Sequence, residues 1–418
     1  MKKNFYIIFI ISLFTMVSCS NYEPDENQSK EFIKLYEISY NEYGYDVKET
    51  SDGGYIIAGS VYIPDSGNNV LIIKTDEFGN ILKKNKKTWI KNYGGKYNDY
   101  ARCVQILPQG YLIFGTYTDS ILNTNLYLLI LNEFGDTIFT RKYGNRSFEY
   151  GNYAQVTSAG NYLLVGSTSQ KVGSTIEIQN SSNESKNILL LFVNNKGDTI
   201  HSNFMLPFGN ETRYDEANYV LKDSMGNLLV VGTTSLLYDI GNELDVFVMK
   251  FNASEKLTAF NLFGKTGNQS AYSITQNNDG RYLICGSSNP GINGSNDILI
   301  IETSKNISDT ALFIKTIGTR ENETALSVLF SRNKYLILSN TEYLSEDKIN
   351  INIRQFYINY ENDSIEVLLD KNIGFTSEYA NRMTLTADGG IIITGYSAYE
   401  RNSDLFLIKT YFNGNLLK

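Results

Sequence analysis

The chain has 418 residues, of which 42% are hydrophobic and 20% are charged, and its 45 acidic and 37 basic residues give a net charge of −8. This composition is too apolar for a disordered chain, and an acidic chain has no general attraction for phosphate backbones, so we expect no nucleic-acid partner. With one His and one Trp, the chain also offers little to His-based catalysis or to stacking on Trp.

The first residues have the features of an export signal. Lys2 and Lys3 precede an apolar stretch, Phe5 to Val17, that is too short to span a membrane and is followed by polar residues. The segment Met16-Val17-Ser18-Cys19 resembles a bacterial lipobox, in which the Cys becomes the lipid-modified first residue of the mature chain. The resemblance implies a signal peptide at residues 1–18, diacylation and palmitate at Cys19, and an outer-membrane location, because Ser20 follows the Cys. The alternative is a plain secretory signal with a chance Cys.

Residues 19–31 form the next predicted unit, a lipidated Cys followed by a flexible tether. Glu23, Asp25 and Glu26 make this stretch acidic, which resembles the surface-export signals of Bacteroidota lipoproteins and implies exposure on the cell surface. The predicted anchoring makes the membrane a partner through the lipid, whereas residues 32–418 form the folded part.

Seven copies of one motif occupy the rest of the chain. Each is a tight turn followed by an apolar strand that closes in a small residue, and the copies recur at intervals of roughly fifty residues, a period typical of repeat folds. The strands begin at Tyr55, Tyr111, Tyr162, Leu228, Tyr282, Tyr335 and Ile391. Turns such as Asp52-Gly53-Gly54 precede them and favour hairpins.

The pattern of apolar runs and turns in each unit predicts four strands linked by hairpins, without helical periodicity, which is typical of a propeller blade. The fold class is therefore predicted to be all-β, a single seven-bladed β-propeller of four-stranded antiparallel blades. The last unit stops just where its outermost strand should begin, while residues near Phe32 to Ile38 form a strand before the first unit. We expect this N-terminal strand to complete the last blade and to remove an open sheet edge.

The Asp-Gly-Gly-Tyr-Ile-Ile-Ala-Gly unit at residues 52–59 resembles the glycine-rich propeller repeats of surface and secreted Bacteroidota proteins. The resemblance covers residues 32–418 and implies the fold, whereas propellers host both binding proteins and enzymes.

The two faces of such a propeller differ in their predicted loops. One face, the turn face, carries short turns, whereas the other, the long-loop face, carries the loops between second and third strands, including Thr168 to Lys186 and Thr234 to Leu244. Because long polar loops on a rigid scaffold usually carry binding, we expect a non-enzymatic, monomeric surface lipoprotein that binds a protein or glycan partner there. The alternative is a glycan-active hydrolase or lyase with carboxylates at the channel mouth, and no catalytic residue is assigned.

One polar residue recurs near the start of each innermost strand, about thirteen positions before the second strand. The resulting channel-mouth ring consists of Glu42, Asn98, Glu149, Asp215, Gln269, Glu323 and Glu378. Such oxygens could hold Ca²⁺, but a residue that recurs in every blade is typical of a structural tie to backbone N–H groups. We expect the tie, and thus neither a metal site nor a cofactor.

Other chemistry-bearing residues are few. Arg102, Arg213 and Arg382 lie near inner-strand starts, where they could clamp an anionic ligand, although we expect them to pair with the ring. His201 is expected in an outer strand without a catalytic partner, and Cys103 and Cys285 are expected to be separate buried thiols.

Overall fold

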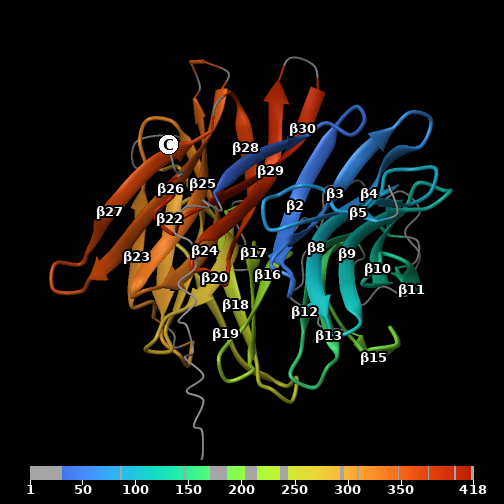
Figure 1. Ribbon diagram of the computed structural model, residues 1–418. Coiled ribbons are helices and arrows are strands. Elements are labelled where there is room, and N and C mark those ends of the chain that lie inside the picture. The colour runs from blue at the N-terminus through green and yellow to red at the C-terminus, as the bar shows by residue number, and fades with distance from the viewer. Residues whose placement is uncertain are drawn as a thin grey trace, which may run out of the picture.

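The structure is a computed structural model that describes residues 31–84, 87–144, 147–169, 186–202, 214–235, 243–291, 296–307, 310–343, 345–346, 348–374, 376–399 and 402–415. These residues form seven four-stranded antiparallel sheets, which confirms the predicted propeller (Figure 1). The predicted signal peptide, Cys19 and the tether lie outside the described residues, except for Glu31. Within the described part, no helix is long and apolar enough to cross a membrane.

The innermost strand of each blade contacts the innermost strands of both neighbouring blades, so the ring is closed. In the order of blades 1 to 7, the inner strands are β2 (Glu42–Glu49), β8 (Tyr100–Leu107), β12 (Glu149–Val156), β16 (Glu216–Lys222), β20 (Asn268–Gln276), β24 (Asn322–Ser331) and β28 (Glu378–Leu385).

The second and third strands form the apolar body of each blade, because they are buried on both faces between neighbouring blades. The second strands are β3 (Tyr55–Ile63), β9 (Gly110–Thr118), β13 (Tyr162–Thr168), β17 (Leu228–Thr234), β21 (Tyr282–Asn289), β25 (Lys334–Tyr343) and β29 (Ile391–Tyr399). The third strands are β4 (Gly67–Thr75), β10 (Thr124–Asn132), β14 (Asn187–Val193), β18 (Asp245–Phe251), β22 (Asp297–Thr303), β26 (Lys348–Asn359) and β30 (Asn402–Thr410). Ile72 of blade 1 and Val104 of blade 2, for example, belong to one buried cluster.

The outer strands are shorter and more exposed, and blade 1 carries an additional small hairpin. The outer strands are β7 (Ile90–Tyr93), β11 (Thr137–Tyr143), β15 (Thr199–Ser202), β19 (Leu257–Phe263), β23 (Phe313–Ile317), β27 (Ser364–Ile373) and β1 (Phe32–Tyr36). The hairpin consists of β5 (Lys83–Lys84) and β6 (Lys87–Thr88).

The N-terminal strand completes blade 7, as predicted. Strand β1 pairs antiparallel with β30, from Phe32 opposite Lys409 to Tyr36 opposite Leu405. In Figure 1 the blue N-terminal strand lies against the red C-terminal strands. Tyr36 is buried and its hydroxyl donates to the carbonyl of Gly79 at 2.7 Å, which also ties the strand to blade 1.

The recurring glycine of the repeat motif has a packing reason. In blade 1, a Cβ at Gly59 of β3 would lie 1.9 Å from the carbonyl oxygen of Tyr43 in β2. The same approach recurs at Gly115, Gly166, Gly232, Gly286 and Gly395. Only glycine permits the inner strand to come this close, and the inner strand departs from regular pairing at that point.

Candidate functional site

Every inner strand carries a β-bulge at the same position. In β2 the register shifts between Gly44 and Asp46, so Tyr45 is the additional residue, and the other six inner strands repeat this shift. The seven bulge residues are Tyr45, Arg102, Asn152, Asn218, Tyr272, Leu326 and Asn381. A bulge redirects a side chain, and here all seven line one central space.

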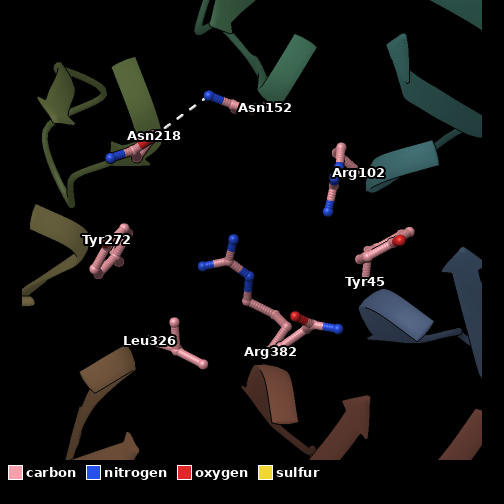
Figure 2. A pocket seen from close by; sticks show the side chains of 8 residues that line it. Tyr45, Arg102, Asn152, Asn218, Tyr272, Leu326 and Arg382 are labelled. Atoms are coloured by element: carbon pink, nitrogen blue, oxygen red, sulfur yellow. Dashed lines mark hydrogen bonds between the residues drawn. The ribbon is translucent and has the colours of Figure 1, made fainter. Parts of the chain in front are cut away.

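This space is a cavity of about 180 Å³ on the propeller axis, lined by the seven bulge residues and by Arg382. Figure 2 shows the labelled side chains around it, with the Arg382 guanidinium pointing into the middle. The volume is below the roughly 300–1,000 Å³ of pockets that enclose a drug-sized ligand. The axial cavity can therefore hold a small molecule or one end group of a larger one.

The asparagines at the bulges hold neighbouring blades together. The Nδ2 of Asn152 donates to the carbonyl of Ala217 at 3.0 Å, that of Asn218 to the carbonyl of Ala271 at 2.8 Å, and that of Asn381 to the carbonyl of Gly44 at 2.7 Å. Each bond reaches the residue just before the bulge of the next blade. Each of these ties uses one of the two N–H donors of the side-chain amide, and the guanidinium groups of Arg102 and Arg382 are the charged donors of the cavity.

Arg382 is held by aromatic rings rather than by a carboxylate. Its guanidinium carbon lies 4.7 Å from the ring centre of Tyr219 and 5.3 Å from that of Tyr153. Its Nε and Nη1 are buried without a hydrogen-bond acceptor. Burial alone would lower the pKa of Arg382, but Asp46 and the tyrosines outweigh it and raise this pKa.

Asp46, the acidic residue beside this site, is already engaged. It is fully buried, and its Oδ1 accepts from Lys48 Nζ at 3.0 Å while its Oδ2 accepts from the backbone N–H of Val104 at 3.0 Å. Lys48 and Asp46 pair beside the cavity, whereas the described residues that line it include two positively charged side chains, Arg102 and Arg382, and no negatively charged one.

A group of tyrosines, the tyrosine platform, lies towards the long-loop face from Tyr45. Tyr43 stacks on Tyr45 with ring centres 6.4 Å apart, Tyr396 lies 4.9 Å from Tyr43, and Tyr379 stacks on Tyr396 at 5.4 Å. All four are half-buried, and the Arg102 guanidinium lies 4.1 Å from the Tyr45 ring. The long-loop side of the axis at blades 7 and 1 is thus aromatic and cationic.

The predicted ring of polar residues occupies a different layer, three positions before each bulge. In blade 2 this position is Asp99 rather than Asn98, because the bulge at Arg102 fixes the register one residue later than sequence spacing suggested. Asp99 is fully buried, whereas Asn98 is exposed and accepts from the backbone N–H of Asn68 at 2.9 Å. Glu42, Glu149, Asp215, Gln269, Glu323 and Glu378 are likewise buried, and none of them is among the residues that line the axial cavity.

The ring residues accept hydrogen bonds from the segments that enter or leave their own blades. Asp99 accepts from the backbone N–H groups of Gly95 at 2.7 Å and Thr118 at 2.9 Å, and Glu378 accepts from the N–H of Thr376 at 2.8 Å. Comparable bonds reach Glu42, Glu149, Asp215, Gln269 and Glu323. Burial, as the largest cause, raises the pKa values of Glu42, Asp99, Glu149 and Glu323.

The remaining candidates that the structure describes are not among the residues that line the axial cavity. His201 is exposed in the outer strand β15, Cys103 and Cys285 are buried free thiols, and Arg213 lies outside the described residues. Neither Arg102 nor Arg382 forms an ion pair with the ring, so the expectation of pairing was wrong for these two. Among the described residues, no group of three or more His, Cys, Asp or Glu side chains is arranged to hold a metal ion.

A larger hollow of about 390 Å³ lies at the turn face between blades 1 and 2. Trp89 and Tyr111 form part of its wall, and Lys74, which pairs with Asp52 at 2.9 Å, forms another part. Two blades build this hollow, whereas all seven blades contribute to the axial cavity.

Sequence reasoning placed Arg102 and Arg382 near the site but missed the bulges. A signal was present: three residues after each ring position stands the bulge residue, and the residue just before it is always Gly or Ala. That small residue pairs opposite the glycine of the second strand in most blades, as Gly44 does opposite Gly59.

Comparison with known proteins finds similarity to solved structures only at low sequence identity. No protein-family model and no curated protein matches the sequence. Similar solved structures include the acylaminoacyl peptidase of Pyrococcus horikoshii, at 11% identity and a TM-score of 0.47 over 90% of this chain and 54% of that chain. The β-propeller domain of the Trilobed protease from Pyrococcus furiosus has 10% identity and a TM-score of 0.47 over 90% of this chain and 97% of that chain. The present chain therefore spans about half the length of the peptidase.

Proposed function

We propose that the protein is a glycan-binding lipoprotein of the bacterial outer membrane, anchored through Cys19, that binds its ligand on the long-loop face over the axial cavity. The observation that carries this proposal is the convergence of seven bulge residues on one cavity beside the tyrosine platform. Tyrosine rings present flat apolar surface together with a polar hydroxyl, a combination suited to sugar rings.

A binding role is favoured over the alternative of a hydrolase or lyase. Glycoside hydrolysis ordinarily needs two carboxylates that face the substrate. The described residues that line the axial cavity include no carboxylate, and neighbouring Asp46 is engaged by Lys48.

The binding proposal is tested with the full chain in detergent against a panel of neutral and acidic oligosaccharides. The double variant Tyr43→Ala/Tyr379→Ala should bind the selected glycan about tenfold more weakly, since two lost ring contacts at about 0.5–1.5 kcal/mol each total about 1–3 kcal/mol, a range that includes the 1.4 kcal/mol of a tenfold change. Tyr357→Ala removes an exposed tyrosine of β26 and serves as the control. Capture of a protein partner without any glycan binding would overturn the glycan assignment.

The anchor is tested separately. Cys19→Ala should abolish lipid labelling and release the protein from the membrane fraction, and unchanged membrane association would refute the anchor.

The long loops provide a further test, although residues 170–185 lie outside the described part. Replacing residues 170–185 by a short Gly/Ser link should leave the melting temperature nearly unchanged, because the entropy of loop closure varies slowly with length. Ligand capture should fall if this loop contributes to the binding face.

A further inference from the structure

We propose that the axial cavity receives an anionic group of the ligand, so that the glycan is an acidic one, and this inference rests on the function proposed above. Carboxylate and sulfate are two sources of such a group in sugars.

Arg382 forms no ion pair with a described residue, because Asp46, the carboxylate that raises its pKa, is engaged by Lys48 and by the N–H of Val104. Nε and Nη1 are buried beside the tyrosine rings without an acceptor, so Nη2 is the guanidinium nitrogen left to face the cavity. A charged donor gains most from an anionic acceptor. A negative group is therefore expected to bind at Nη2.

Arg102 adds a second positive charge to the same cavity. It is exposed, and its guanidinium stacks at 4.1 Å from Tyr45 and 5.7 Å from Tyr100. Such stacking fixes the plane of the guanidinium while its N–H groups stay free to donate at the edge. A ligand anion between the two arginines would accept hydrogen bonds from both.

The cationic donors of the cavity are its strongest. One N–H of each side-chain amide of Asn152, Asn218 and Asn381 is used by a tie between blades, and Lys48 is paired with Asp46. The neutral donors that also line the cavity, such as the hydroxyls of Tyr45 and Tyr272, form weaker hydrogen bonds with an anion than a guanidinium does.

The volume limits how much of the ligand enters. A cavity of about 180 Å³ holds one small polar group, while the following sugar rings would lie on the tyrosine platform. Acid recognition at the axis and stacking at the mouth are then two parts of one site.

The experiment uses the full chain in detergent and calorimetric titration with matched probes. Oligogalacturonate is compared with its fully methyl-esterified form, sialyllactose with lactose, and a sulfated oligosaccharide with its desulfated form. At least one acidic member should bind ten or more times tighter than its neutral counterpart, and the arm in which this occurs identifies carboxylate or sulfate.

Two variants and a control then test whether the preference for the acidic probe depends on the cavity arginines. Arg382→Gln and Arg102→Gln should each reduce affinity for the acidic probe tenfold or more, towards the level of its neutral counterpart, whereas Arg141→Gln, which removes an exposed arginine of the outer strand β11, should not. If Arg382→Gln does not fold, Arg102→Gln decides, because Arg102 is exposed.

The outcomes separate the two proposals. Equal binding of acidic and neutral probes that is lost in Tyr43→Ala/Tyr379→Ala would overturn the acidic ligand and keep the glycan-binding function. Acid preference that is unchanged in both arginine variants would also overturn the inference. Absence of binding to every probe would refute both.

Discussion

The ring residues and the bulge residues occupy the same seven strands three positions apart, yet they differ in kind. At the ring, six blades carry Asp or Glu and blade 5 carries Gln269. All seven side chains are buried and hydrogen-bonded to segments of their own blades. At the bulges, the side chain is Tyr, Arg, Asn or Leu, and it faces the axial cavity. Positions that fix the segments entering and leaving each blade repeat because every blade has the same geometry, whereas positions that meet a ligand differ because the ligand is not sevenfold symmetric. The bulge residues, which differ between blades, are therefore the ones to associate with function.

The largest loss of stability is expected when β1, the strand that completes blade 7, is deleted. Deleting Glu31 to Ser39 removes β1, exposes the edge of β30 and removes the burial of Tyr36. The free energy of unfolding should fall by about 4 kcal/mol, since full burial of each large side chain contributes about 1.5–3 kcal/mol. Chemical denaturation measures this change. Deletion of residues 21–29 is the control, and equal stability of both truncated proteins would contradict the role of β1.

The next effect tests the ring as a structural tie. Changing Glu149, Asp215 and Glu323 together to Ala removes the acceptors of several donors, among them the N–H of Ser235 and the N–H of Thr319. At about 1 kcal/mol for each blade, the protein should lose about 3 kcal/mol of stability. Calorimetry with and without Ca²⁺ checks the alternative. A melting temperature that Ca²⁺ raises in the parent but not in the variant would favour a metal site over the tie.

A third prediction concerns the pH dependence of stability and Asp245, a buried acid outside the ring. Asp245 of β18 is buried beside Gly264, and burial followed by the charge of Glu243 raises its pKa to about 6. Because the folded-state pKa lies above the unfolded value of about 3.9, the contribution to stability is full below about pH 4 and is lost as pH rises to about 6. Relative to Asp245→Asn, the parent should lose about 2 kcal/mol over this range in denaturant unfolding. Glu133→Gln, at an exposed acid, should follow the parent curve.

The smallest effect on stability is expected from a substitution at a bulge residue. Tyr272→Asn introduces the residue that three other blades carry at the bulge, and the new amide can tie to the next blade as Asn218 ties to Ala271. Stability should change by less than about 1 kcal/mol, as is usual for partly exposed positions. Binding of the selected glycan should change more than the melting temperature does. The reverse result would show that the bulge residues serve the fold instead.

Sequence periodicity predicted the blade number, the strand order and the closing strand, because each blade repeats the same hairpins and apolar pattern. The ring was predicted for six of seven blades and failed at Asn98, where spacing counted from the second strand differs by one residue from the structural register. The cavity was not predicted, since a bulge changes which side chains face the axis without changing composition. The ties of Asn152, Asn218 and Asn381 were also not predicted, because each joins two different blades, through residues that are 65, 53 and 337 positions apart in sequence.

The pairing of β1 with β30 has a consequence for how the protein forms. Strand β1, near the start of the chain, has no partner until β30, near its end, is present. Contacts of such large sequence separation slow folding. During that interval the alternating Phe32-Ile33-Lys34-Leu35-Tyr36 segment could pair with another chain, a risk that the charge of Lys34 reduces. Folding of the six other blades can proceed meanwhile, so the closing blade should be the last to gain protection from hydrogen exchange during refolding.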